Sequence, residues 1–135
     1  MKIFYGILVC LTLAVPARAA DIYRVEKVIN GHTLLLSNHK TVRLIGIEAS
    51  SDAATEFVRQ MVEGKGVKLE FDKTREDADG IWLAYVLMIE TFLNATLVHA
   101  GYAVPVSMPP NTVHDELFNS LYEDAVKNHR GLWKN

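Results

Sequence analysis

The sequence predicts a small α+β domain, mainly β with helices, in which a five-stranded barrel of the oligonucleotide-binding type is closed by about three helices. Three observations support this fold class. Three short apolar runs rich in β-branched residues precede the first helical pattern, two more follow it, and apolar residues then recur at helical spacing towards the C-terminus. A chain in this order suits such a barrel.

Three strands are expected before the first helix, over residues 22–29, 33–36 and 41–47. The first run mixes β-branched and other apolar residues with polar ones, as strands do, and Asn30-Gly31 then marks a turn. The polar residues 37–40 separate the second run from the third, which indicates a hairpin. These three strands should therefore form a meander.

The first helix is expected to follow the third strand directly. Either Ser50 or Ser51 can cap it, because a serine hydroxyl accepts a hydrogen bond from the first turn. Apolar residues recur at helical spacing as far as Val62, and Gly64 ends the pattern. The apolar side of this helix should lie across the sheet.

Two strands and two helices complete the domain. Strands are expected at residues 67–71 and 82–89, a short helix at 92–100, an extended connection at 104–110 and a last helix from about 112 to 130. Gly101 ends the short helix, and the connection holds three of the four prolines. Leu132 and Trp133 should fold back against the body of the domain.

Residues 1–19 have the features of an export signal. Lys2 is followed by an apolar run from Ile3 to Val15 and by the small-residue cleavage site Ala17–Ala19. The apolar run is shorter than the ~20 residues that a membrane-spanning helix needs. We therefore expect cleavage, no membrane span in the mature chain, and a location in a periplasm or outside the cell. Cleavage would also remove Cys10, the only cysteine.

The remaining domain, residues 20–135, is acidic. The whole chain has a formal charge of −2, and loss of Lys2 and Arg18 lowers the number of lysines and arginines from 14 to 12 against 16 acids, a charge of −4. Proteins that bind nucleic acid non-specifically usually present a basic face, whereas the basic residues here are scattered. The composition disfavours nucleic acid as a partner and leaves a protein or a small anionic ligand.

Several segments resemble the staphylococcal nuclease (thermonuclease) family. Residues 28–51 read VINGHTLLLSNHKTVRLIGIEASS, where the family pattern runs DGDT, a short hairpin and RLIGIDAPE. LAYV at 83–86, NATLVHAGYA at 94–103 and GLW at 131–133 match further family landmarks in order and spacing. The resemblance spans roughly residues 21–133, and it implies a barrel of the staphylococcal nuclease type and an ancestry in metal-dependent cleavage of DNA or RNA.

The resemblance also implies where a calcium ion would sit. Two aspartates and a backbone carbonyl hold the ion in that family, and these positions fall on His32, Glu48 and Ala49. Calcium takes six to eight hard oxygen ligands, so an imidazole at position 32 weakens the site and favours transition metals. We therefore expect no bound cofactor, and calcium least of all.

The catalytic positions that the resemblance implies are altered as well. The glutamate that activates water falls on Ser51, and the two arginines that hold the phosphate fall on Arg43 and Ile81. Loss of a positioned base costs about 10²–10⁴ in rate, and loss of an electrostatic clamp about 10²–10³. What remains is a remnant cleft of Asn30, His32, Thr33, Arg43, Glu48 and Ala49. Among the side chains to which the resemblance gives a functional role, Thr33 and Arg43 alone keep the family's residue types.

Nearby residues could replace the missing catalytic and metal-binding groups. Asp52 could replace the missing base if its loop shifted, and Arg75 could replace the missing clamp. His32 and Glu48 could begin a site for zinc, nickel or copper, or they could form a histidine–carboxylate hydrogen bond. Arg43 could meet an anion, or it could pair with Glu48. Further carboxylates that could complete a metal shell are Asp52, Asp77 and Asp79.

Two functional hypotheses of different classes follow. The first is an exported pseudoenzyme, a nuclease-like domain that acts as a binding or accessory module, and a pure scaffold in a larger assembly is a weaker variant of it. The second is a phosphodiesterase on DNA or RNA that uses His32 and Glu48 with a softer divalent metal. The two hypotheses differ in whether metal-dependent cleavage survives.

Overall fold

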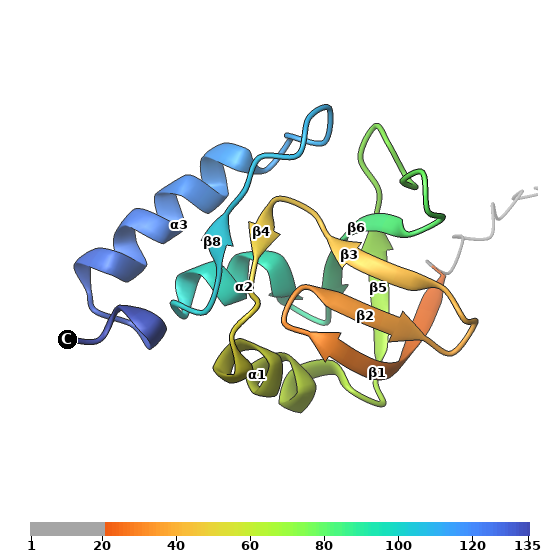
Figure 1. The fold of residues 1–135 in the computed structure, drawn as a ribbon, viewed down its shortest axis with the longest axis horizontal. Coiled ribbons are helices and arrows are strands. Elements are labelled where there is room, and N and C mark those ends of the chain that lie inside the picture. The colour runs from red at the N-terminus through yellow and green to blue at the C-terminus, as the bar shows by residue number, and fades with distance from the viewer. Residues whose placement is uncertain (1–20) are drawn as a thin grey trace, which may run out of the picture.

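A closed barrel of five strands forms the centre of the molecule (Figure 1). The structure is a computed structural model that describes residues 21–135, and the export signal expected at residues 1–19 lies outside them. The barrel strands are β1 (Ile22–Asn30), β2 (Thr33–Leu36), β3 (Thr41–Leu44), β5 (Gly66–Glu70) and β6 (Trp82–Met88). Neighbours pair antiparallel except β3 and β6, whose parallel pairing closes the ring. The predicted barrel is confirmed.

The alternation of side chains along β3 decides which residues face the core. Val42 and Leu44 are fully buried, whereas Thr41 and Arg43 are half-buried. Because successive side chains of a strand point to opposite faces, Arg43 lies on the outside of the barrel. It pairs with Thr33 on β2 and with Leu83 on β6.

The strand expected at residues 41–47 is divided in two. β3 ends at Leu44, and β4 (Ile47–Glu48) leaves the barrel to pair with β8 (Val104–Pro105). Gly46 stands at the break with a φ of 80°, a region that residues with a side chain rarely adopt. This break directs Glu48 and the following loop towards the first helix.

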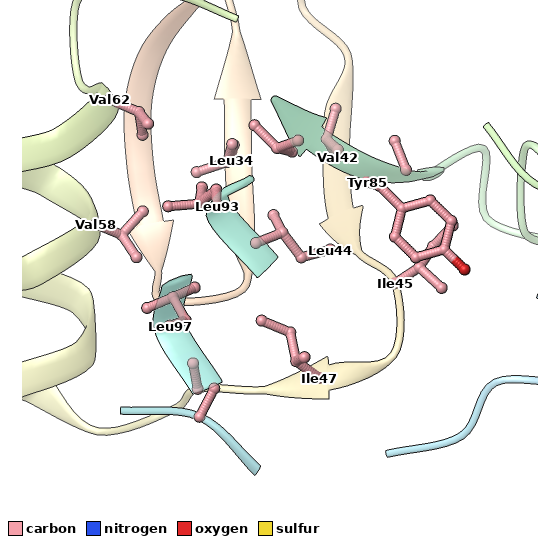
Figure 2. Packing of buried hydrophobic residues seen from close by; sticks show 14 of the residues in the cluster. Leu34, Val42, Leu44, Ile45, Ile47, Val58, Val62, Tyr85, Leu93 and Leu97 are labelled. Carbon is pink, nitrogen blue, oxygen red and sulfur yellow. The ribbon is translucent and has the colours of Figure 1, made fainter. Parts of the chain in front are cut away.

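Helix α1 (Asp52–Val62) is capped by Ser51, one of the two serines expected there. The Ser51 Oγ accepts a hydrogen bond from the Ala54 N–H at 3.1 Å. The helix buries Ala54, Val58 and Val62, and it packs against β1. Figure 2 shows Val58 and Val62 pointing from α1 into the cluster that Leu34 and Leu93 share.

Two more helices cover the barrel and extend beyond it. After the short strand β7 (Thr91–Phe92) comes α2 (Leu93–His99), which packs against β6 and against α3 (Asp115–Lys127). Figure 1 shows α3 lying alongside β8, outside the barrel. No helix within residues 21–135 combines the length and the apolar character that crossing a membrane requires.

The ends of α3 differ slightly from expectation. The helix begins at Asp115 rather than near residue 112, because the Asp115 N–H donates to the Thr112 carbonyl in a turn at 3.1 Å. After the helix, the 3-10 turn η1 (Gly131–Trp133) folds back as expected, and the Leu132 N–H donates to the Gly101 carbonyl at 2.9 Å. The C-terminus is thereby attached to the end of α2.

Asn94 is a fully buried polar residue at the closing seam of the barrel. Its Oδ1 accepts a hydrogen bond from the Val86 N–H at 3.0 Å, and its Nδ2 donates to the Ile45 carbonyl at 2.9 Å. Val86 belongs to β6, and Ile45 follows β3. The side-chain amide of Asn94 therefore joins α2 to β6 and to the residue that follows β3.

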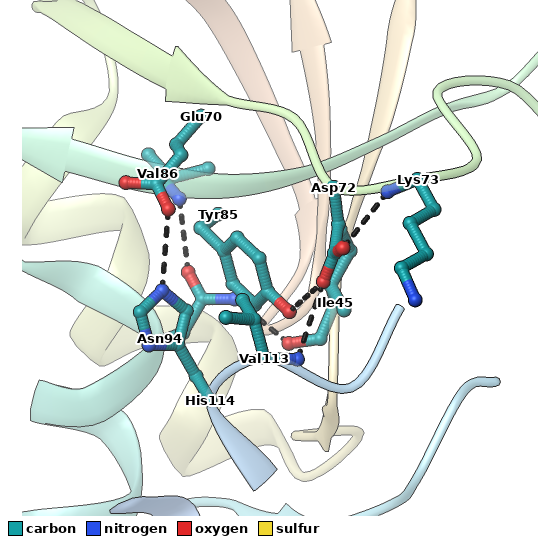
Figure 3. Close-up of polar contacts among 9 residues, drawn as sticks. All are labelled: Ile45, Glu70, Asp72, Lys73, Tyr85, Val86, Asn94, Val113 and His114. Carbon is teal, nitrogen blue, oxygen red and sulfur yellow. Dashed lines mark hydrogen bonds and ion pairs between the residues drawn. The ribbon is translucent and has the colours of Figure 1, made fainter. Parts of the chain in front are cut away.

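A polar network attaches the start of α3 to the barrel (Figure 3). The Tyr85 hydroxyl donates to Asp72 Oδ2 at 2.8 Å, and the Val113 N–H donates to the same oxygen at 3.3 Å. Burial raises the pKa of Tyr85, and the hydrogen bond to Asp72 raises it further. The His114 Nε2 lies 3.3 Å from Glu70 Oε1, so two contacts fix the approach to α3.

Replacement of Asn94 tests the seam. We expect Asn94→Ala to lower the free energy of unfolding by about 3 kcal/mol, because the Val86 N–H and the Ile45 carbonyl lose their partner away from water. Urea unfolding measures the change. Asn119→Ala, at an exposed position of α3, is the control and should change stability by less than about 0.5 kcal/mol. Equal effects of the two variants would contradict the role of Asn94.

Candidate functional site

The turn between β1 and β2 lies directly against the loop that leads into α1. A Cβ placed on Gly31 would lie 2.4 Å from the carbonyl oxygen of Ala49 and 3.0 Å from the Cβ of Ala54. Only glycine permits this approach, since real Cβ atoms do not come so close to other atoms. The contact places His32, the next residue, beside Ala49.

His32 is held by hydrogen bonds at its backbone and at its ring. The His32 N–H donates to Asn30 Oδ1 at 3.0 Å, and the ring Nδ1 accepts from the Ala49 N–H at 2.8 Å. A ring nitrogen that accepts a hydrogen bond carries no proton, so the proton of the neutral ring is on Nε2. Within residues 21–135 the His32 ring makes no hydrogen bond to Glu48, and its Nδ1 bonds to a backbone amide instead.

The surroundings of His32 keep its ring neutral. Burial lowers the pKa of His32 below its ordinary value, the positive charge of Arg43 lowers it further, and the negative charge of Glu48 acts in the opposite direction. Protonation of Nδ1 would also remove the acceptor of the Ala49 N–H. Both effects favour the uncharged imidazole.

Burial lowers the pKa of Arg43, and the negative charge of Glu48 acts in the opposite direction. Within residues 21–135 the two side chains form no ion pair at 4.0 Å or less. The Arg43 Nη1 donates instead to the Leu44 carbonyl at 3.1 Å, and the Glu48 side chain is exposed at the end of β4. Arg43 keeps other N–H groups that can bind an anion, since a guanidinium carries five.

Ser51 and Ile81 occupy the two positions that the family resemblance assigns to a base and a second phosphate clamp. The Ser51 hydroxyl accepts the N-cap bond of α1, and Asp52 next to it is already the first residue of that helix and is exposed. Ile81 is apolar and half-buried, and its N–H donates to Asp77 Oδ1 at 3.0 Å. Neither position presents a base or a cation to the cleft.

The residues that sequence analysis offered as substitutes have other partners. The Arg75 guanidinium lies over the ring of Phe71, 4.1 Å from its centroid. The Asp77 Oδ1 accepts from the N–H groups of Asp79 and Ile81 and thereby closes a turn. The part of the chain that the structure describes has no group of three or more His, Cys, Asp or Glu side chains placed to hold a metal ion. This donor set does not fit calcium.

A small cavity lies on the loop between β4 and α1. Its volume is about 280 Å³, and its walls are residues 48–51, 102–104, Leu132 and Trp133. The C-terminal residues fold back as the sequence predicts, but the position of Tyr102 and Trp133 at the same cavity as Glu48 was not predicted. The apolar GLW ending is the one signal that could have indicated this contact.

Comparison with known proteins agrees with the fold. The family model described as staphylococcal nuclease homologue matches residues 37–135. A thermonuclease of Staphylococcus intermedius is 28% identical over 127 residues, which cover 83% of this chain and 76% of that protein. A thermonuclease of Staphylococcus hyicus is 26% identical over 128 residues, with coverage of 84% and 76%.

The pH dependence of stability tests the environment of His32. Because the folded pKa of His32 lies below the unfolded value near 6.5, the unfolded chain binds more protons, and stability is lost as the pH falls through 6.5 towards the folded pKa. His32→Asn keeps a side-chain acceptor for the Ala49 N–H and cannot titrate. We expect the wild-type chain to lose stability relative to this variant as the pH is lowered.

Urea unfolding of both proteins between about pH 5 and pH 8 measures the difference. The histidines elsewhere in the chain contribute to both proteins, so subtraction isolates His32. Parallel stability curves for the two proteins would show that His32 is no more difficult to protonate in the folded chain than in the unfolded one.

Proposed function

The chain belongs to the staphylococcal nuclease family, and from this premise we propose that it is an exported binding or accessory module without effective nuclease activity. The mature domain is residues 20–135, released into a periplasm or to the outside of the cell when the signal at residues 1–19 is removed. The charge of this domain, −4, favours a protein partner or a small anionic ligand over nucleic acid.

The observation that supports the loss of activity most directly is the use of Ser51 as a helix cap. Its hydroxyl accepts the Ala54 N–H, and a serine hydroxyl is not a general base at neutral pH. The His32 side chain also has a structural hydrogen bond, because its Nδ1 accepts from the Ala49 N–H. Two positions that would serve a base and a metal ligand in a nuclease thus make hydrogen bonds that stabilise the fold.

The remnant cleft still carries one cation suited to binding. Arg43 is half-buried, and its Nη1 is bonded to the Leu44 carbonyl, which holds the guanidinium in place. No ion pair with Glu48 neutralises it within the described residues. A phosphate or carboxylate group of a ligand could therefore bind to its remaining N–H groups.

The second candidate function is a metal-dependent phosphodiesterase, and the state of His32 favours it. A neutral imidazole is the form that binds transition metals, and the lowered pKa of His32 keeps the ring in that form. Glu48 is exposed at the end of β4 and could supply a carboxylate. In this alternative the proton would move from Nε2 to Nδ1, the Ala49 N–H would lose its acceptor, and the freed Nε2 lone pair would bind zinc, nickel or copper.

Cleavage assays separate the two candidates. We expect the purified protein to leave single-stranded DNA and RNA intact in calcium, magnesium, manganese or zinc, because base, clamp and one carboxylate ligand are replaced together. Gel electrophoresis of labelled substrates measures this. Metal-dependent cleavage that disappears in both His32→Ala and Glu48→Ala would instead establish the phosphodiesterase.

The triple variant His32→Asp, Ser51→Glu, Ile81→Arg is the matched positive control. It restores the family's residue types at the three altered positions, and it should cleave if the barrel keeps the geometry of the family. An inactive triple variant that is folded would show that residues outside these positions have also changed the cleft.

Phosphate binding tests the role of Arg43. We expect phosphate to raise the melting temperature of the wild-type chain, because a ligand that binds the folded state stabilises it. Arg43→Ala should abolish this response and lower stability by about 1 kcal/mol, since no ion pair is broken. Arg24→Ala, an exposed cation on β1, is the control and should respond as the wild type does. Equal phosphate responses in all three proteins would exclude Arg43 as the anion site.

A further inference from the structure

The hairpin between β6 and β7 carries an exposed apolar side chain at its tip. Ile89 is 93% exposed, the highest value among the large apolar residues of the described chain, and Ile22 at the start of β1 is 61% exposed. Glu90 follows Ile89 with a φ of 57°, in a region that few residues other than glycine adopt. The turn thus holds Ile89 away from the barrel at some cost in backbone energy.

Two hollows adjoin this tip. The first, about 470 Å³, is lined by Ile22, Lys68 and residues 87–90, and the second, about 460 Å³, by residues of α1 and by Thr91. Gly66, Met88 and Ile89 line both. A projecting apolar side chain therefore stands next to apolar hollows of the same surface.

The first hollow also carries one charge of each sign. Lys68 on β5 and Glu90 at the tip both line it, and both are exposed. Neither belongs to an ion pair within residues 21–135. A two-fold interface uses the same patch on both copies, so each group of one copy meets a different group of the other. A surface that carries a projecting apolar side chain, a hollow, a cation and an anion supplies both partners of each such contact.

We propose that a second copy of this chain docks on this surface in a two-fold arrangement. Ile89 of each copy inserts into the first hollow of the other, against Ile22 and Met88. Lys68 of each copy pairs with Glu90 of the other at the edge of the contact. The inference goes beyond the proposed function, since it involves neither the remnant cleft nor any ligand.

The contact is small, so the dimer is weak. Interfaces of stable dimers bury well over 1,000 Å² in total, and one hairpin tip with its surroundings offers less. The expected species is a dimer that is populated at on the order of 100 µM and dissociates on dilution. The charged pair at the edge fixes the orientation more than it adds affinity.

Sedimentation velocity of the protein, purified as expressed from its full-length coding sequence, tests the proposal. The wild-type chain should change from monomer to dimer as its concentration rises to about 1 mM. Ile89→Asp should remain monomeric, and it should fold normally because Ile89 is almost fully exposed. Ile29→Asp, at the other end of β1 and 48% exposed, is the matched control and should dimerise.

Exchange of the two charges makes the test specific to the proposed arrangement. Lys68→Glu and Glu90→Lys should each weaken the dimer at least tenfold, because like charges then face one another across the axis. The double variant Lys68→Glu, Glu90→Lys should restore it. A wild-type chain that stays monomeric at every concentration, a dimer that survives Ile89→Asp, or a double variant as weak as the single ones would each overturn the proposal.

Discussion

The barrel depends on the parallel pairing of β3 with β6, and the amide of Asn94 holds that pairing at its end. The other strand pairs of the barrel are antiparallel. The parallel pair β3 and β6 joins the two ends of the barrel's strand order and thereby closes the ring between segments far apart in the sequence. Asn94 bonds to Val86 on β6 and to Ile45 after β3, at the point where the chain turns away to form β4. A fully buried amide with both polar atoms satisfied specifies one arrangement, because any displacement leaves polar groups unpaired.

The candidate site follows from this closure. Once β3 lies beside β6, Arg43 faces outwards, and the chain beyond Gly46 carries Glu48 and Ala49 to the turn at Gly31. The backbone amide of Ala49 then meets the His32 ring. The strand connections thus determine where the charged and hydrogen-bonding side chains of this region lie. His32 and Ser51 use their side chains to hold the loop between β4 and α1 in place. This is the physical content of the proposal that the domain binds rather than cleaves.

Much of this architecture could be predicted from the sequence, because apolar periodicity and turn residues are local signals. The strand at 33–36 has the predicted bounds, and Ser51 is one of the two caps expected for α1. The division of residues 41–47 could not be foreseen, since a β-branched run does not report the φ of Gly46. The hydrogen bond from the Ala49 N–H to His32 could not be predicted for a different reason. Its donor is a backbone group, which every residue type except proline carries, so no residue pattern marks it.

The role of Ser51 as the N-cap of α1 opposes the return of a catalytic glutamate at this position. A glutamate at this position would leave the first turn of α1 without its acceptor, at about 1 kcal/mol, and would bring a second carboxylate to a cavity that Glu48 already lines. If the domain has lost cleavage as proposed, a lineage that regained one catalytic group at a time would first become less stable, and it would gain no cleavage until the other groups returned. Selection for a stable fold therefore acts against each separate step of such a return, and the present arrangement should persist even where hydrolysis would be useful.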